Sequence, residues 1–341
     1  GHTGFKGTWL SLWLQSMGVI VKGYSLEPNT IPNLFTEACV GKNMESEIGD
    51  IRDLNQISKS MLDFNPDVLI HMAAQPLVRY SYKNPIETYS TNIMGTVNVL
   101  ECARKCSNLK SIVSITTDKC YENTGVMTGY KEYDPMGGHD PYSSSKGCAE
   151  LVTSSFRNSF FNPSKFLEHK VAIASVRAGN VIGGGDWGTD RLIPDIIRGI
   201  QNKSVIKIRN PEAIRPWQFV LDPLFGYMIL AEKMWEEGSK YSQEWNFGPT
   251  KDEDIPVKQM MEIIKNHMHD ELNFEIEDST QPHEETYIRL DCSKSLNQLG
   301  WKSKMDIKGT LLFTTEWYKE FINGNNMKEF TEKQIEKYMV K

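Results

Sequence analysis

The stretch that decides the fold is Gly1-His2-Thr3-Gly4-Phe5-Lys6-Gly7, with which the 341-residue sequence opens. Glycines at positions 1, 4 and 7 permit a tight turn, a close approach of backbone to a pyrophosphate and close helix packing. The apolar spacing of residues 8–17 predicts a helix after this turn, and residues 19–24 have the composition of a buried strand. Because such a turn normally follows a strand, we expect the sequence to be the remainder of a longer protein.

Predicted strands and helices alternate along the first half of the chain. We expect helices over residues 54–64, 85–105 and 142–159, and strands over residues 68–71, 111–115 and 171–176. This alternation predicts an α/β fold with a Rossmann-type, doubly wound parallel sheet. Beyond Arg177 the pattern loosens, which predicts a smaller C-terminal substrate-binding domain. We therefore place a dinucleotide-binding Rossmann domain in residues 1–178 and the second domain in residues 179–341, with about 216–248 returning to pack on the first.

The composition excludes several classes of function. A formal net charge of -6 leaves no basic surplus to neutralise nucleic-acid phosphates. No apolar run approaches the length of a membrane span. The six cysteines show no metal-ligand spacing, which predicts free thiols in a reducing compartment, the cytoplasm, and no metal site.

A Tyr-x-x-x-Lys pair lies in Asp140-Pro141-Tyr142-Ser143-Ser144-Ser145-Lys146. Four residues make about one helical turn, so Tyr142 and Lys146 share a helix face. A nearby cation favours phenolate, and we expect Lys146 to lower the pKa of Tyr142 so that this phenol exchanges protons near neutral pH. The same spacing is common on exposed helices. Two other segments support a functional interpretation of the pair here: the glycine-rich turn, and Ile115-Thr116-Thr117-Asp118-Lys119 at the end of a predicted strand.

The end of the second strand bears on the choice of cofactor. An acidic residue there normally holds the adenosine ribose, but the position carries Ser25, without an Arg to meet a 2′-phosphate, so NAD is favoured over NADP. Asp50 and Ile51 suit an adenine edge, although Asp50 equally suits a helix N-cap. The predicted cofactor-binding residues are Gly1, Gly4, Phe5, Lys6, Gly7, Ser25, Asp50, Ile51, Ala73, Ala74, Gln75, Asn92, Tyr142 and Lys146.

Five segments in order carry a family resemblance. They are Gly1 to Gly7, Thr117-Asp118-Lys119-Cys120-Tyr121-Glu122-Asn123, Asn180-Val181-Ile182-Gly183-Gly184-Gly185-Asp186-Trp187, Asp190-Arg191-Leu192-Ile193-Pro194-Asp195 and Arg215-Pro216-Trp217-Gln218. With them, residues 1 to about 301 resemble the extended short-chain dehydrogenase/reductase family, and within it the nucleotide-sugar 4,6-dehydratases that use CDP-glucose. The resemblance implies a tightly held NAD, loss of water from a nucleotide sugar, and commonly a homodimer through the helices near 85–105 and 142–159. It also implies a deoxysugar for a surface polysaccharide such as lipopolysaccharide O-antigen.

The resemblance also implies catalytic roles. Tyr142 takes the C4 hydroxyl proton, Lys146 holds the nicotinamide ribose, and Thr117 hydrogen-bonds the C4 oxygen. Asp118 protonates the departing C6 hydroxyl, which requires a carboxyl kept protonated by burial or a neighbouring charge. Lys119 stands where the dTDP-glucose relatives carry a Glu that removes the C5 proton. Lys119 is then either that base, in its neutral form, or a residue that orients substrate or pairs with Asp118.

A second set of residues is expected to bind the nucleotide sugar. The resemblance puts Asn180 at the diphosphate, and Arg191 and Arg215 are either its cations or surface ion pairs. Trp187 and Trp217 line a base or sugar, or belong to the core. The predicted set is Asn180, Gly185, Trp187, Arg191, Leu192, Arg215 and Trp217. The alternatives are a nucleotide-sugar 4-epimerase, a dehydratase for another NDP-glucose and a non-catalytic NAD-binding protein, and Asp118 discriminates against the epimerase.

Overall fold

The computed structural model describes residues 1–126, 128–208, 210–249, 254–268, 274–276 and 287–341. The helices are α1 Phe5–Ser16, α2 Leu34–Glu37, α3 Leu54–Phe64, α4 Val78–Lys83, α5 Pro85–Tyr89, α6 Gly95–Ala103, α7 Pro141–Ser159, α8 Phe166–His169, α9 Leu192–Asn202, α10 Leu221–Glu237, α11 Val257–Met268, α12 Ser293–Leu299, α13 Ile307–Ile322 and α14 Met327–Met339. The strands are β1 Lys22–Ser25, β2 Glu45–Ile48, β3 Val68–His71, β4 Ser111–Ile115, β5 Ala172–Arg177, β6 Val181–Ile182, β7 Ile206–Ile208, β8 Ile214–Arg215, β9 Gln218–Phe219, β10 Glu244–Asn246, β11 Ile255–Pro256 and β12 Phe274–Ile276.

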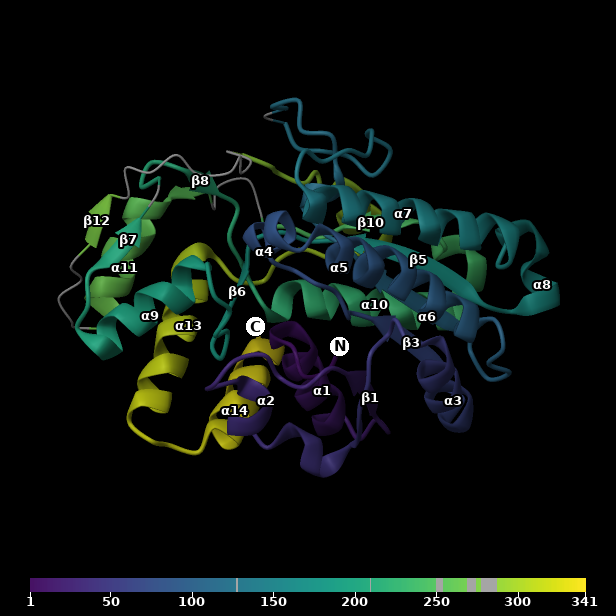
Figure 1. Cartoon of the computed structure of the whole chain (residues 1–341), viewed down its shortest axis with the longest axis horizontal. Helices are drawn as coiled ribbons and strands as arrows, with labels where there is room; N and C mark the ends of the chain where they lie inside the picture. Colours follow the sequence, from purple (N-terminus) through teal and green to yellow (C-terminus); the bar gives the residue numbers. More distant parts are fainter. Residues whose placement is uncertain (127, 209, 250–253, 269–273, 277–286) are drawn as a thin grey trace.

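Parallel strands with helices between them confirm the predicted α/β class. Strands β10, β5, β4 and β3 form a parallel sheet in that order, and β1 pairs with β2 in a second parallel sheet (Figure 1). The glycine-rich turn lies beside β3, because a Cβ built on Gly1 would meet the backbone of Ala73 at 2.6 Å. The turn therefore sits at the carboxyl end of β3.

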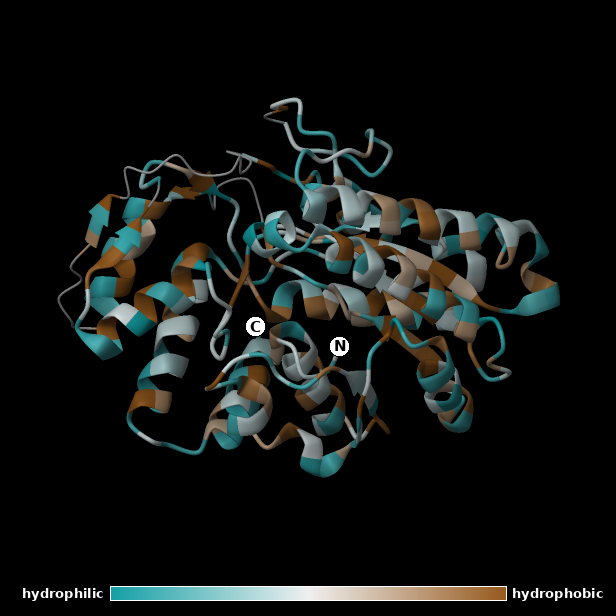
Figure 2. Ribbon diagram, in the orientation of Figure 1, coloured by the Kyte–Doolittle hydropathy of each residue, from teal (hydrophilic) through white to brown (hydrophobic). Residues whose placement is uncertain are grey.

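Both faces of the larger sheet are buried. Successive side chains of a strand point to opposite faces, so neighbouring residues report on the two sides of the sheet. Val113 and Ala174 belong to the core cluster that contains residues of α1 and α10. Ile112 and Ile173, their neighbours in sequence, belong to the cluster that contains residues of α3 and α6. Figure 2 shows β5 as a hydrophobic stretch between more polar helices.

Segments from the second half of the chain return to this sheet. Helix α10 packs against β4 and β5, and β10 pairs with β5 as its parallel neighbour. Helices α11 and α13 pack against each other, and the short pairs β6 with β9 and β7 with β12 lie in the same C-terminal part. The chain beyond β5 thus contributes both to the central sheet and to a second, smaller assembly (Figure 1).

The long helix predicted over residues 85–105 is interrupted. Helices α5 and α6 are joined by a π-helical turn, Ser90–Met94, which contains the buried Asn92. The Asn92 amide accepts from the Gln75 backbone N–H at 2.8 Å and donates to the Ser145 hydroxyl at 2.8 Å. Tertiary contacts of this side chain accompany the wider turn, and such π-turns inside helices are frequent at functional sites.

The N-terminus of α7 is fixed by Asp140. The Asp140 carboxylate accepts a hydrogen bond from the Ser143 backbone N–H at 2.9 Å, and Pro141 occupies the first helical position. This cap sets the direction in which the first turn of α7 presents Tyr142.

Replacing Asp140 by Ala removes the cap, and we expect the free energy of unfolding to fall by about 1 kcal/mol. Urea unfolding followed by circular dichroism measures the change. Asp140→Asn keeps the acceptor oxygen and serves as the control, so an equal loss in both variants would contradict the capping role.

Candidate active site

A cavity of about 410 Å³ lies where β4 and β5 end. Thr117 and Asp118 reach it from the end of β4, Asn180 follows β5, and Tyr142 comes from α7. Ligands of open α/β sheets bind at this edge, outside the carboxyl ends of the strands. The predicted site residues that line the cavity are Phe5, Lys6, Thr117, Asp118, Lys119, Tyr142, Asn180, Arg191, Leu192, Arg215 and Trp217.

Asp118 is a buried carboxyl at the base of this cavity. The Thr117 hydroxyl donates to its Oδ1 at 2.9 Å. Burial raises the pKa of Asp118, and the opposing effects of Lys119 and Thr117 do not reverse the shift. The environment therefore favours the protonated carboxyl, the form that can donate a proton to a leaving oxygen.

Gly179 makes room for that carboxyl. A Cβ built on Gly179 would lie 1.7 Å from Asp118 Oδ2, so any side chain there would displace the carboxyl group. The sequence contains no local sign of this contact, because residues 118 and 179 meet only through the pairing of β4 with β5.

The Tyr142 and Lys146 pair differs from the expectation in its proton affinities. Burial raises the pKa of Tyr142 to about 12. The predicted lowering of this pKa by Lys146 is therefore not found in the protein without cofactor. Burial also lowers the pKa of Lys146 to about 8, and the charge of Lys6 lowers it further. The Lys146 ammonium donates to the Ile115 carbonyl at 3.3 Å. For Tyr142, desolvation outweighs the hydrogen bond with Thr117 and the charge of Arg191, both of which lower the pKa.

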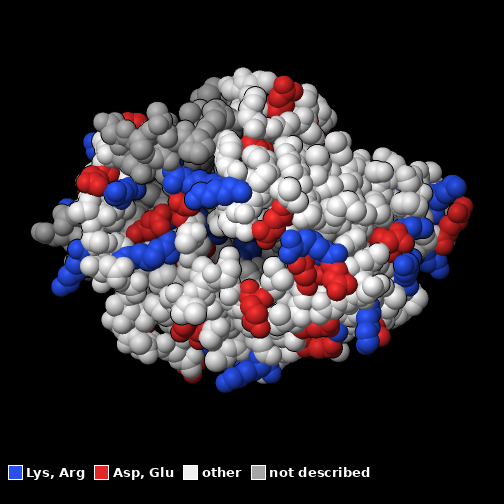
Figure 3. Space-filling view, in the orientation of Figure 1, with Lys and Arg blue, Asp and Glu red and all other residues white. Residues whose placement is uncertain are grey.

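Cations surround the cavity. Burial lowers the pKa of Lys6 to about 8, with Arg191 lowering it further and Asp118 opposing. Arg191 Nη1 is held by the Asp186 carboxylate at 3.0 and 2.8 Å, and the charge of Arg215 acts on Asp118. Figure 3 shows Lys and Arg side chains, with Asp and Glu side chains among them, around a hollow in this face of the molecule. This charge suits an anionic ligand such as a diphosphate.

The glycine-rich turn fits a dinucleotide. A Cβ on Gly7 would lie 2.0 Å from the Gly1 carbonyl oxygen, so only glycine permits this turn. Helix α1 begins with Gly4 as its N-cap and has neither a side-chain cap nor an acidic residue in its first turn. Its first N–H groups can therefore receive phosphate oxygens. The Ser25 hydroxyl, at the end of β1, lies 2.9 Å from the Thr3 hydroxyl.

Several predicted residues lie away from the cavity. Trp187 is buried against Tyr318 and Phe321, which is the core alternative for this side chain. Gly185 has a φ of 79° and packs against Leu34. These placements separate Trp187 and Gly185 from Arg191 and the rest of the predicted substrate set.

The predicted adenine contacts are also engaged within the chain. Asp50 is ion-paired with Arg52 at 2.5 Å, and Ile51 is buried against Gly95. Asn92, predicted to bind the cofactor, accepts a hydrogen bond from the Gln75 backbone N–H and donates one to the Gln75 carbonyl, directly after β3. Among the residues that the structure describes, no group of three or more His, Cys, Asp and Glu could hold a metal ion, and no helix is long and apolar enough to cross a membrane.

Comparison with known proteins places the fold and the family. A family model described as GDP-mannose 4,6 dehydratase matches residues 1–312. The chain belongs to the GDP-mannose 4,6-dehydratase family. A curated CDP-glucose 4,6-dehydratase from Salmonella typhimurium is 52% identical over 99% of this chain and 94% of its own length. A dTDP-glucose 4,6-dehydratase from Haemophilus influenzae is 25% identical over 79% of this chain and 81% of its own length.

Solved structures show the same fold as this family member. A UDP-glucose 4-epimerase from Thermotoga maritima, with UDP-glucose, matches with a TM-score of 0.79 at 21% identity and covers 94% of this chain and 98% of its own. A dTDP-glucose 4,6-dehydratase from Bacillus anthracis, in complex with NAD, has a TM-score of 0.77 at 19% identity and covers 95% of this chain and 96% of its own. At these identities the likeness concerns the fold alone.

The lowered pKa of Lys146 predicts a gain in stability when its charge is removed. With an unfolded pKa of 10.5 and a folded pKa of about 8, burying the ammonium opposes folding at pH 7 by roughly 3 kcal/mol, partly offset by its bond to Ile115. We expect Lys146→Met to raise the free energy of unfolding by ~1–3 kcal/mol at pH 7. The gain should shrink as the pH rises from 8 to 10.5 and vanish above, where Lys146 is neutral in both states.

Urea unfolding at pH 7 and pH 10.5 measures this difference. Lys165→Met, at an exposed position, is the matched control and should change stability at neither pH. A pH-independent effect of Lys146→Met would contradict burial as the cause of the lowered pKa.

Proposed function

We propose that this chain catalyses the NAD-dependent conversion of CDP-glucose to CDP-4-keto-6-deoxyglucose and water. The observation that carries the reaction type is the buried carboxyl of Asp118, whose raised pKa favours the acid form, in one cavity with Thr117 and Tyr142. The choice of CDP-glucose rests on the 52% identity to the Salmonella enzyme over nearly the whole chain. A hydro-lyase needs such an acid at C6, and a 4-epimerase does not.

The chain's own residues divide the proton transfers. Bound NAD would supply the hydride acceptor for C4 and the source of the hydride for C6, so that it would end unchanged. In its phenolate form, Tyr142 takes the proton of the C4 hydroxyl, and Thr117 holds the same oxygen in place. The C4 ketone acidifies the C5 proton, which Lys119, in the lining of the same cavity, removes and returns to C5 when the hydride reaches C6. Asp118 then gives its proton to the departing C6 hydroxyl.

NAD is held by the glycine-rich turn and by groups at the ends of β1 and β3. Gly1, Gly4 and Gly7 admit the pyrophosphate, and the first turn of α1 offers it N–H groups. Lys146 binds the nicotinamide ribose. Ala73 and Ala74, with the Gln75 backbone fixed by Asn92, support the cofactor after β3.

The nucleotide sugar binds in the rest of the cavity. Arg191 and Arg215 meet its diphosphate, with Arg191 oriented by Asp186. Asn180 adds a neutral donor, and Trp217 lines the wall near the sugar or base. Residues 1–178 act as the NAD-binding part and residues 179–341 as the main substrate-binding part.

The protein works as a homodimer or higher homo-oligomer in the cytoplasm. Ile86 on α5 and Leu151 on α7 expose 85% and 61% of their surface, and these helices lie side by side. Its six cysteines are free thiols, which suits a reducing compartment. The product supplies a deoxysugar for a surface polysaccharide such as O-antigen. Sedimentation velocity, cell fractionation and sugar analysis after gene deletion test these three statements.

A proton NMR time course of the protein with CDP-glucose and NAD tests the activity. We expect a C6 methyl doublet to appear together with the C4 ketone. Formation of a C4 epimer without the methyl signal would favour the epimerase, and turnover of dTDP-, GDP- or UDP-glucose in its place would reassign the nucleotide.

Two substitutions separate the half-reactions. Tyr142→Phe should abolish both product and transient NAD reduction, because no group then takes the C4 proton. Asp118→Asn should lower turnover by about 10²–10⁴-fold while transient NAD reduction by CDP-glucose persists, because only the C6 acid is lost. Stopped-flow absorbance of the reduced nicotinamide and the NMR assay measure the two effects. Tyr133→Phe, at an exposed tyrosine, is the control.

Gly179→Ala tests the position of the acid. Its Cβ would push the Asp118 carboxyl aside, and we expect kcat to fall by roughly 10–100-fold with little change in NAD affinity. Steady-state kinetics and NAD titration measure both. Gly248→Ala is the control, since the nearest side-chain atom to its Cβ would be 3.4 Å away. An unchanged kcat in Gly179→Ala would contradict the role of this contact.

A further inference from the structure

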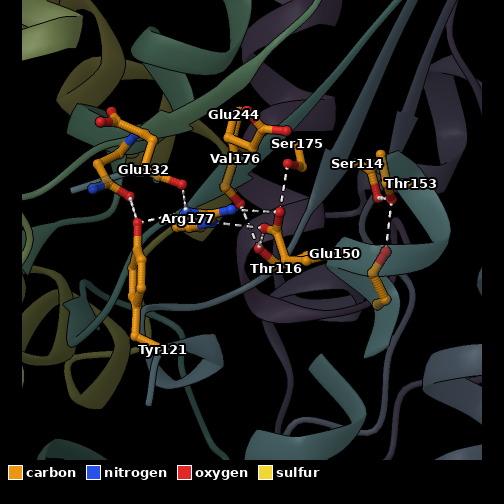
Figure 4. A network of polar contacts seen from close by, with 12 residues as sticks. Ser114, Thr116, Tyr121, Glu132, Glu150, Thr153, Ser175, Val176, Arg177 and Glu244 are labelled. Atoms are coloured by element: carbon orange, nitrogen blue, oxygen red, sulfur yellow. Dashed lines mark hydrogen bonds and ion pairs between the residues drawn. The ribbon is translucent and has the colours of Figure 1, made fainter. Parts of the chain in front are cut away.

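A buried ion pair lies behind the cavity, between the last residue of β5 and the middle of α7. Arg177 Nη2 donates to Glu150 Oε2 at 2.8 Å, and Arg177 Nε donates to Glu150 Oε1 at 3.0 Å. Their side chains are 1% and 3% exposed, and Figure 4 shows the guanidinium and the carboxylate facing each other. Neither residue lines the cavity. The pair therefore contacts substrate and cofactor only through other residues.

Glu150 holds the chain just before the catalytic segment. Its carboxylate also accepts hydrogen bonds from the hydroxyls of Thr116 and, at 2.7 Å, Ser175. Thr116 directly precedes Thr117, and its hydroxyl also contacts the Val176 carbonyl at 3.1 Å. Burial alone would raise the pKa of Glu150, but the charge of Arg177 and these hydrogen bonds outweigh it, so the pKa is lowered. The group acts as an ionised carboxylate with both oxygens occupied.

Arg177 holds the chain just after the same segment. Its Nη1 donates to the Tyr121 hydroxyl at 2.6 Å and to the Glu132 carbonyl at 2.9 Å. The guanidinium also lies over the Tyr121 ring, 4.8 Å from its centroid, and the Tyr121 hydroxyl donates to Asn246 Oδ1 at 2.8 Å. Figure 4 shows Tyr121 and Glu150 on opposite sides of Arg177.

The pair thus fixes both ends of the short turn that carries Thr117, Asp118 and Lys119. It also fixes that turn relative to α7, where Glu150 follows Lys146 by one turn and Tyr142 by two. We propose that Glu150 and Arg177 are positioning residues, which set the distance of Asp118 and Thr117 from Tyr142.

The chemistry of the pair explains why apolar side chains cannot replace it. Two apolar residues of similar volume would join α7 to β5, and such replacements are often neutral or stabilising. Apolar side chains could not accept the hydrogen bond from the Thr116 hydroxyl or donate one to the Tyr121 hydroxyl. Lysine at position 177 would keep the charge but lacks the planar fork that reaches Glu150, Tyr121 and Glu132 together.

Variants of the pair separate positioning from packing in the full-length protein with NAD and CDP-glucose. In Glu150→Gln and in Arg177→Lys we expect kcat to fall at least tenfold, with KM and NAD affinity changed less than threefold. In the double variant Glu150→Leu with Arg177→Met, we expect the free energy of unfolding, measured with urea, to be higher than in Arg177→Met alone. We expect kcat of the double variant to stay at least tenfold below that of the unmodified protein.

The matched control is a second ion pair of α7. Arg157 pairs with Glu244 of β10 and donates to the Ile173 carbonyl at 3.2 Å, far along the helix from Tyr142. Arg157→Met should lower stability but change kcat less than twofold. A kcat within threefold of the unmodified value in the double variant, or in a folded Glu150→Gln if the double variant does not fold, would overturn the proposal.

The kinetic part rests on the proposed dehydratase activity, so a second readout is independent of turnover. In crystal structures of Glu150→Gln and the unmodified protein we expect the Asp118 carboxyl to differ in position by more than 1 Å, about the misplacement that reduces catalysis strongly. If the unmodified protein does not convert CDP-glucose, the proposed function fails, and this displacement still decides the positioning role. An unmoved Asp118 would overturn it.

Discussion

The parallel pairing of β4 with β5 is the interaction on which the site depends. Ile115 lies opposite Val176, so the residues beyond the two strand ends, Thr117 and Asp118 on one side and Gly179 on the other, are brought together. A register shift of one residue would reverse the faces of every side chain of the strand and remove the space that Asp118 occupies. This single edge of the sheet therefore locates the cavity and the carboxyl group of Asp118.

Burial then acts differently on paired and unpaired charges. Burial shifts the pKa of Asp118, which lines the cavity, upward and that of Lys146, on α7, downward, both toward their neutral forms. Behind the cavity, Arg177 and Glu150 satisfy each other and keep their charges in an equally dry environment. Burial thus shifts the groups whose partners do not offset it toward their neutral forms, whereas the ion-paired groups stay charged.

The sequence predicts the elements better than their tertiary contacts. Helix α3 and strands β3 and β4 occupy the residues expected for them, because their apolar pattern is set locally. The interruption between α5 and α6 was not predictable, since it accompanies the bonds of Asn92 to residues far along the chain. Trp187 and Trp217 illustrate the same limit, because two tryptophans in equally suggestive motifs lie in the core and at the cavity.

The sequence contains one pattern from which the position of Glu150 could have been predicted. Residues 142, 146 and 150 are spaced by four, so a carboxylate on the face of Tyr142 and Lys146 could have been expected, but its partner Arg177 and the exclusion of a side chain at Gly179 arise only from folding. The same reasoning explains why a fold shared with a 4-epimerase at a TM-score of 0.79 does not fix the reaction. In the mechanism we propose, Tyr142 and Lys146 serve oxidation at C4, a step that a 4-epimerase also needs. Elimination needs one more proton donor, and Gly179 leaves room there for the carboxyl group of Asp118, whose pKa burial raises.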